Sequence, residues 1–108
     1  MDPSDFVDVA ALDEIPGDGT LPVALPSGEH LCLIRCGDQV SALLDQCSHQ
    51  AMPLSAGEVL PDGTIECAWH GARFDCRTGA VRRGPAEDDV PAYAVRVENG
   101  RVLVGVES

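Results

Sequence analysis

The chain has 108 residues, and its formal net charge is −11 at pH 7. All seven of its basic residues are arginines, and so acidic a protein is a poor partner for nucleic acid or for an anionic membrane surface. No apolar run approaches the roughly 18 residues that a membrane span needs. The start, Met1-Asp2-Pro3-Ser4-Asp5, lacks the basic region of a secretory signal. We therefore expect one cytoplasmic domain, residues 1–108, with a modest core.

Along the chain, apolar residues recur with a period of two, which is typical of β-strands, and no segment shows a helical period. The predicted strands cover residues 6–10, 21–25, 30–36, 39–45, 57–60, 64–68, 73–76, 80–82, 93–98 and 101–106. Turn residues separate them at 17–19, 37–38, 61–63, 77–79, 84–86 and 99–100. Asn99-Gly100 is the strongest hairpin signal. The fold class that this pattern predicts is all-β, with short antiparallel strands.

Two short segments that follow predicted hairpins carry potential metal ligands. They read Cys47-Ser48-His49 and, after a gap of seventeen residues, Cys67-Ala68-Trp69-His70. Two thiolates and two imidazoles could hold one metal ion or a two-iron cluster. A zinc site usually takes its first pair of ligands from a turn with two to four intervening residues, and here there is one. In a two-iron cluster, the two cysteines can bind one iron and the two histidines the other, so the ligands of one segment need not bind the same metal ion.

The spacing C-x-H, then seventeen residues, then C-x-x-H resembles that of the Rieske ferredoxins, especially those that serve bacterial aromatic-ring dioxygenases. The flanking sequences, C-S-H-Q-A-M-P-L-S-A-G and C-A-W-H-G-A-R-F-D-C-R-T-G, are similar as well. The resemblance implies a Rieske-type antiparallel β-sandwich whose two hairpin-tip loops hold one [2Fe-2S] cluster. The implied ligands, both cofactor-binding and metal-binding, are Cys47, His49, Cys67 and His70.

Two departures distinguish the chain from the respiratory Rieske proteins. Those proteins join their cluster loops by a disulfide, and Met52 and Trp69 occupy the corresponding positions here. They also place a serine hydroxyl near the cluster, where this chain has Ala72. The loss of the serine hydrogen bond to sulfur and the strongly negative net charge both predict a reduction potential at the low end of the Rieske range.

The resemblance implies an electron-transfer protein and not an enzyme. It would carry single electrons from an NAD(P)H-dependent flavoprotein reductase to the terminal oxygenase of a multicomponent aromatic-ring dioxygenase, of the biphenyl, toluene, naphthalene or carbazole type. A terminal oxygenase also needs a mononuclear iron held by two histidines and a carboxylate, whereas His30 is the one histidine left in this sequence. Two alternatives stay open: the small Rieske-like subunit of an assimilatory nitrite reductase and a zinc-binding interaction module.

Two further expectations concern the remaining side chains. Cys32 and Cys36 share one face of a predicted strand but lie about 13 Å apart, too far for a disulfide, and we expect both to be buried thiols. We also expect the partners to dock on an apolar rim around the histidines. This rim would consist of Met52, Pro53, Leu54 and Trp69.

Overall fold

The computed structural model describes residues 5–17, 19–36, 39–46, 53–67, 71–83 and 89–106. Its elements in chain order are β1 (Asp5–Ala11), the 3-10 helix η1 (Leu12–Glu14), β2 (Thr20–Ala24), β3 (His30–Cys36), β4 (Gln39–Leu44), the 3-10 helix η2 (Leu54–Ala56), β5 (Glu58–Val59), β6 (Thr64–Glu66), β7 (Arg73–Asp75), β8 (Val81–Arg83), β9 (Ala92–Tyr93), β10 (Val95–Glu98) and β11 (Arg101–Val106). The predicted all-β class is confirmed. No helix in these described ranges could cross a membrane.

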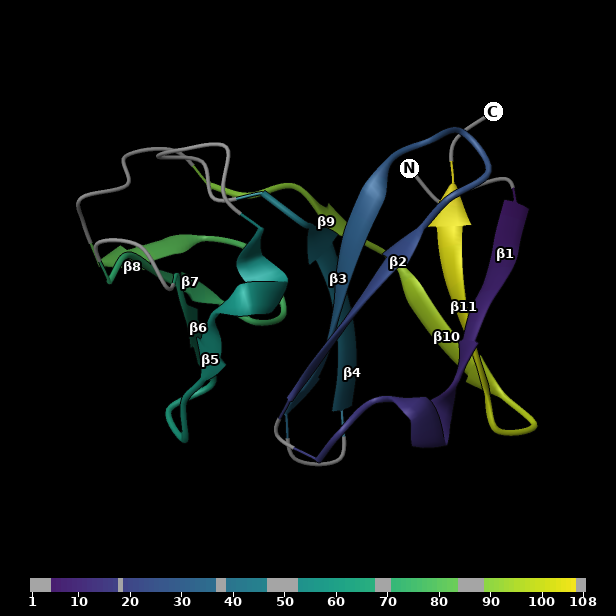
Figure 1. Cartoon of the computed structure of the whole chain (residues 1–108), viewed down its shortest axis with the longest axis horizontal. Coiled ribbons are helices and arrows are strands. Elements are labelled where there is room, and N and C mark those ends of the chain that lie inside the picture. The colour runs from purple at the N-terminus through teal and green to yellow at the C-terminus, as the bar shows by residue number, and fades with distance from the viewer. Residues whose placement is uncertain are drawn as a thin grey trace.

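The strands form three antiparallel sheets with the orders β1-β11-β10, β2-β3-β4-β9 and β5-β6-β7-β8. Figure 1 shows the β2-β3-β4-β9 sheet between the other two. The outer sheet that contains β1 pairs the first described residue with the last, Asp5 with Val106. The β5-β6-β7-β8 sheet, on the opposite side, carries the second predicted ligand segment between β6 and β7.

Strand β3 is buried on both faces, because a sheet packs against each of them. Leu31 and Leu33 belong to a first core, shared with the sheet of β1, β10 and β11. Cys32 and Ile34 belong to a second core, shared with the sheet of β5 to β8. The members of this second core are Cys32, Ile34, Leu43, Leu54, Ile65, Cys67, Ala72, Phe74, Cys76 and Val90. The middle sheet thus packs against the core that includes Cys67, the one predicted ligand among the described residues.

Two details differ from the sequence prediction. The structure contains two one-turn 3-10 helices, η1 and η2, where no helical segment was expected. The predicted strand 93–98 is divided at Ala94 into β9, which pairs with β4, and β10, which pairs with β11. Apolar and polar residues continue to alternate across Ala94, so the sequence period does not reveal that the chain passes from one sheet to another at this residue.

The hairpin at 99–100 has the geometry that its sequence predicts. Asn99 and Gly100 have φ angles of 52° and 74°, which are the positive values of a type I′ turn. The predicted turns at 37–38 and 84–86 lie outside the described residues.

Candidate metal centre

The structure describes the bases of both predicted ligand loops. Of the four predicted ligands, Cys67 lies within the described residues, whereas Cys47, His49 and His70 lie outside them. Trp69 and Met52 are also outside. The geometry of the centre therefore comes from the residues that flank the two loops, at 45–46, 53–57, 66–67 and 71–73.

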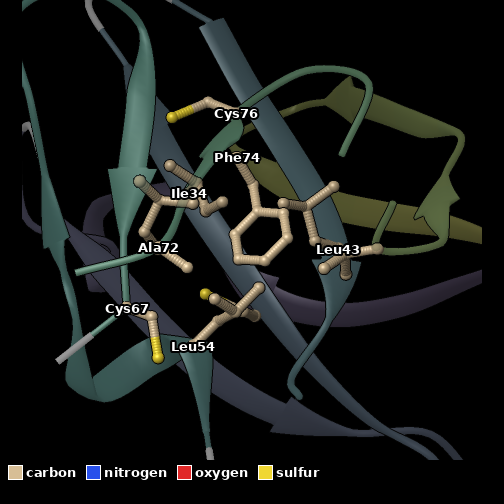
Figure 2. Close-up of a cluster of buried hydrophobic side chains, with 10 residues drawn as sticks. Ile34, Leu43, Leu54, Cys67, Ala72, Phe74 and Cys76 are labelled. Carbon is tan, nitrogen blue, oxygen red and sulfur yellow. The ribbon is translucent and has the colours of Figure 1, made fainter. Parts of the chain in front are cut away.

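Cys67 lies directly after β6, at the margin of the second core. Its side chain is buried, with 2% of the residue exposed. Its backbone N–H donates a hydrogen bond of 2.7 Å to the carbonyl oxygen of Ala72, which closes the loop of residues 68–71. Gly71 has a φ of 72°, a left-handed backbone conformation that glycine adopts without steric cost. Figure 2 shows the Cys67 sulfur directed away from Phe74, at the end of the core where Leu54 and Ala72 also lie.

A carboxylate joins the two ends of the first loop. Asp45 lies just after β4, and its two oxygens accept hydrogen bonds from Ser55, at 2.7 Å from the backbone N–H and 2.8 Å from the hydroxyl. The Ser55 carbonyl in turn accepts a hydrogen bond of 2.8 Å from the Thr20 hydroxyl on β2. Sequence reasoning missed this clamp. The available signal was an acidic residue directly after the apolar pair Leu43-Leu44, where a capping role is common.

The bases of the two loops lie against each other at Gly57. A Cβ atom built on Gly57 would lie 2.1 Å from the carbonyl oxygen of Glu66, and the next residue, Glu58, pairs with Glu66 across β5 and β6. Because Glu66 precedes Cys67, the chain that leaves the first loop touches the chain that enters the second. A glycine is required for this approach of two backbones.

The prediction that Leu54 belongs to an exposed docking rim is wrong. Leu54 is fully buried in the second core, because it begins η2 and that turn packs against β2 and β3. It cannot form part of an exposed apolar rim. Pro53, the preceding residue, is exposed, and Met52 and Trp69 lie outside the described residues.

Two arginines of this sheet form ion pairs with carboxylates. Arg73 on β7 forms an ion pair of 3.0 Å with Glu66 on β6, and Arg82 on β8 forms one of 3.0 Å with Asp75. Partial burial acts to raise the pKa of Asp75, but hydrogen bonds from backbone amides and from Arg82 outweigh it and hold that pKa below its usual value. Arg83 is exposed. This surface therefore has mixed charge.

Comparison with known proteins identifies the family to which this chain belongs. Residues 5–94 match the Rieske [2Fe-2S] domain. The chain belongs to the Rieske family. It is 36% identical to the ferredoxin component of the p-cumate 2,3-dioxygenase system of Pseudomonas putida, over 98% of this chain and 90% of that protein.

Solved structures of Rieske ferredoxins have the same fold. The ferredoxin of carbazole 1,9a-dioxygenase from Nocardioides aromaticivorans IC177 superposes with a TM-score of 0.87 at 34% identity, over 96% of this chain and all of that one. A chain in a complex of reduced oxygenase and oxidized ferredoxin in carbazole 1,9a-dioxygenase superposes with a TM-score of 0.86 at 29% identity, over 95% of this chain and 94% of that one. The Rieske-type fold predicted from the sequence is confirmed.

The family carries one [2Fe-2S] cluster of the Rieske type, and the residues of this chain fit it. Two thiols and two imidazoles are the donor set of such a cluster. Cys67 is buried at the base of its loop, as suits a ligand shielded from water. The family match favours this cofactor over the zinc-binding alternative.

The Asp45 clamp provides a prediction. Asp45→Ala removes both acceptors for Ser55, and each hydrogen bond to a carboxylate contributes roughly 1.5–3 kcal/mol. We expect the purified variant to contain distinctly less iron per chain than the parent, because the first loop is no longer closed at its base. Iron analysis and the visible spectrum of freshly purified protein measure this.

A matched control is Asp62→Ala. Asp62 also accepts hydrogen bonds from the backbone and hydroxyl of one residue, Thr64, at 3.1 and 2.6 Å, but in the turn between β5 and β6. This variant should lose some thermal stability and keep its iron. Equal iron content in the two variants would show that the Asp45 clamp has no specific role in holding the first loop.

Proposed function

We propose that this protein is a cytoplasmic single-electron carrier. It passes electrons from an NAD(P)H-dependent flavoprotein reductase to the terminal oxygenase of a multicomponent aromatic-ring dioxygenase. The observation that carries the proposal is the match, over nearly the full length of both chains, to ferredoxin components of dioxygenase systems. A solved complex of an oxygenase with a similar ferredoxin supports the choice of the oxygenase as a partner.

We further propose that the whole chain, residues 1–108, is one domain that holds the cluster through four side chains. Cys47 and Cys67 would bind one iron, and His49 and His70 the other. A bound Rieske cluster supplies reversible one-electron chemistry. The burial of Cys67 and the closed base of its loop support its place on the inner side of the site. Histidines at the outer side would give the electron a short path to a docked partner.

The ligand assignment predicts the composition of the purified protein. We expect two irons and two acid-labile sulfides per chain, the composition of a [2Fe-2S] cluster, and a Rieske-type electron paramagnetic resonance spectrum. His49→Cys should abolish that spectrum, because a thiolate changes the donor set of the outer iron. His30→Ala, at an exposed position at the start of β3, should leave it unchanged.

Two results would overturn the assignment. One is a colourless protein that contains one zinc per chain. The other is a Rieske spectrum that survives His49→Cys.

The carrier role is tested by reconstituted turnover. A purified reductase and oxygenase of an aromatic-ring dioxygenase, without their own ferredoxin, should oxidise substrate at a rate that rises with the concentration of this protein. The same rate with and without the protein would contradict the proposal. A nitrite reductase large subunit assayed in parallel distinguishes the alternative, since stimulation of nitrite reduction alone would assign the chain to that system.

A further inference from the structure

Three cysteines in addition to the proposed ligands lie between the middle sheet and the β5-β6-β7-β8 sheet. Cys32 and Cys36 are on the face of β3 that looks toward the second core, and Cys76 directly follows β7. Cys32 and Cys76 are fully buried. Cys36, predicted as a buried thiol, is only half-buried. The two facing sheets therefore bring thiols from distant parts of the sequence into one layer.

Cys36 and Cys76 are neighbours in this layer. Cys36 packs against the core that contains Cys76, and it lines a surface pocket together with Asp62, Gly63 and Arg77. Gly63, which lines the same pocket, also holds Cys76 in place. Its carbonyl oxygen accepts a hydrogen bond of 3.0 Å from the backbone N–H of Cys76. Burial raises the pKa of Cys76 to about 12, and the adjacent Cys36 thiol is the next cause.

The third thiol is placed differently. Cys32 is fully enclosed, and its sulfur lies 3.9 Å from the carbonyl oxygen of Leu33. Burial is the main cause that raises its pKa far above the usual value, and the effect of Cys76 is smaller. Within the described ranges no three cysteine, histidine or acidic side chains gather as metal ligands, so the layer of thiols does not form a second metal site there.

We propose that Cys36 and Cys76 are a redox-active thiol pair, which oxidises to an intramolecular disulfide when the protein meets a small disulfide oxidant such as oxidised glutathione. Cys36 reaches the solvent through the pocket and attacks first. Its thiolate displaces one thiol from the oxidant and forms a mixed disulfide. The Cys76 thiol then gives up its proton, and its sulfur displaces the second small thiolate from the mixed disulfide. Each leaving thiolate takes up one proton, so two protein thiols are oxidised and one small disulfide is reduced to two thiols.

The bond would link the middle sheet to the sheet that presents Cys67. Cys36 ends β3, and Cys76 directly follows the strand that returns from the second ligand loop. A covalent link between these two cysteines excludes the unfolded conformations in which they lie far apart, and so raises the stability of the folded state. We expect oxidation to raise the thermal unfolding midpoint of the holoprotein.

Peptide mapping tests the bond directly. The holoprotein is incubated with oxidised glutathione, treated with N-ethylmaleimide, denatured in excess reagent and digested with trypsin. Cleavage after Arg35, Arg73 and Arg77 places Cys32 in residues 1–35, Cys36 in residues 36–73 and Cys76 in residues 74–77. The proposal predicts a new species that joins 36–73 to 74–77, lighter by two hydrogens than the sum of the peptides and removed by reduction.

Variants identify the sulfurs and exclude the other cysteines of residues 36–73. Cys36→Ser, at a half-buried site that should tolerate a hydroxyl, must abolish the linked species and the rise in midpoint, while Cys32→Ala must keep both. A link between 1–35 and 74–77 would overturn the proposal in favour of Cys32. A linked species that persists in Cys36→Ser would assign the bond to a cluster cysteine, and fully alkylated Cys36 and Cys76 after oxidation would show that no bond forms.

Discussion

Replacing Gly79 with alanine is expected to prevent accumulation of folded protein. Gly79 has a φ of 75°, and a Cβ atom there would lie 1.9 Å from the carbonyl oxygen of Val90. The Gly79 carbonyl also accepts the Val90 N–H at 2.8 Å, so relief of the overlap breaks that bond and displaces a buried residue. A left-handed alanine alone costs about 1–2 kcal/mol. Together these costs are a large fraction of the roughly 5–15 kcal/mol that typically stabilises a domain.

Gly63→Ala separates the two costs. Gly63 has a φ of 86°, but nothing lies within 4 Å of the position that a Cβ atom would take there, so its variant suffers the conformational strain alone. We expect it to fold, with a free energy of unfolding lower by about 1–2 kcal/mol. Soluble yield and urea denaturation compare the pair. Equal losses in the two variants would show that contact with Val90 does not matter.

The strands were predictable where the alternation is bounded by strong turn residues. Residues 30–36 coincide with β3, and 39–45 exceed β4 by one residue, because Gly37-Asp38 separates two apolar runs. The Asn99-Gly100 turn was equally clear, since few residues tolerate two consecutive positive φ values. In each case the signal is local, and local signals are what a single sequence contains.

The arrangement of the sheets was not predictable in the same way. The partner of a strand depends on residues far along the chain, as when Asp5 pairs with Val106. The apolar run Leu31-Cys32-Leu33-Ile34 indicates burial on both faces, but not which layer lies on which side. The strand predicted at 93–98 is divided at Ala94 because its two parts join different sheets, and the alternation of apolar and polar residues does not change at that point.

The same distinction between local and long-range information applies to the candidate metal centre. The types and spacing of the four proposed ligands predicted the family, because cluster chemistry restricts the donors to a few kinds. The hydrogen bonds from Ser55 to Asp45 and the burial of Leu54 depend on how η2 turns, which a short Leu-Ser-Ala segment does not specify. The spacing therefore indicates the cofactor, and the tertiary structure determines which neighbours support it.

Gly57→Ala is expected to produce a protein that folds but binds little iron. The φ and ψ of Gly57 are −85° and −167°, which alanine adopts without strain, so the cost arises from contact alone. Its Cβ atom would lie 2.1 Å from the Glu66 carbonyl oxygen and 3.1 Å from that of Leu54. Both are backbone atoms, so β5 must separate from β6 and move Cys67 relative to the first loop. The first core, in the other two sheets, is untouched.

The measurement is iron per chain together with the Rieske spectrum, compared with the far-ultraviolet circular dichroism of the same sample. We expect iron to fall several-fold while the β-sheet signal persists, because a displacement of about 1 Å is large against metal–ligand tolerances of about 0.2 Å. Gly17→Ala is the control, since nothing lies within 4 Å of the corresponding Cβ position, and it should retain full iron. Full iron in Gly57→Ala would mean that the two loop bases can separate without disturbing the ligands, and that the contact between Gly57 and Glu66 does not position Cys67.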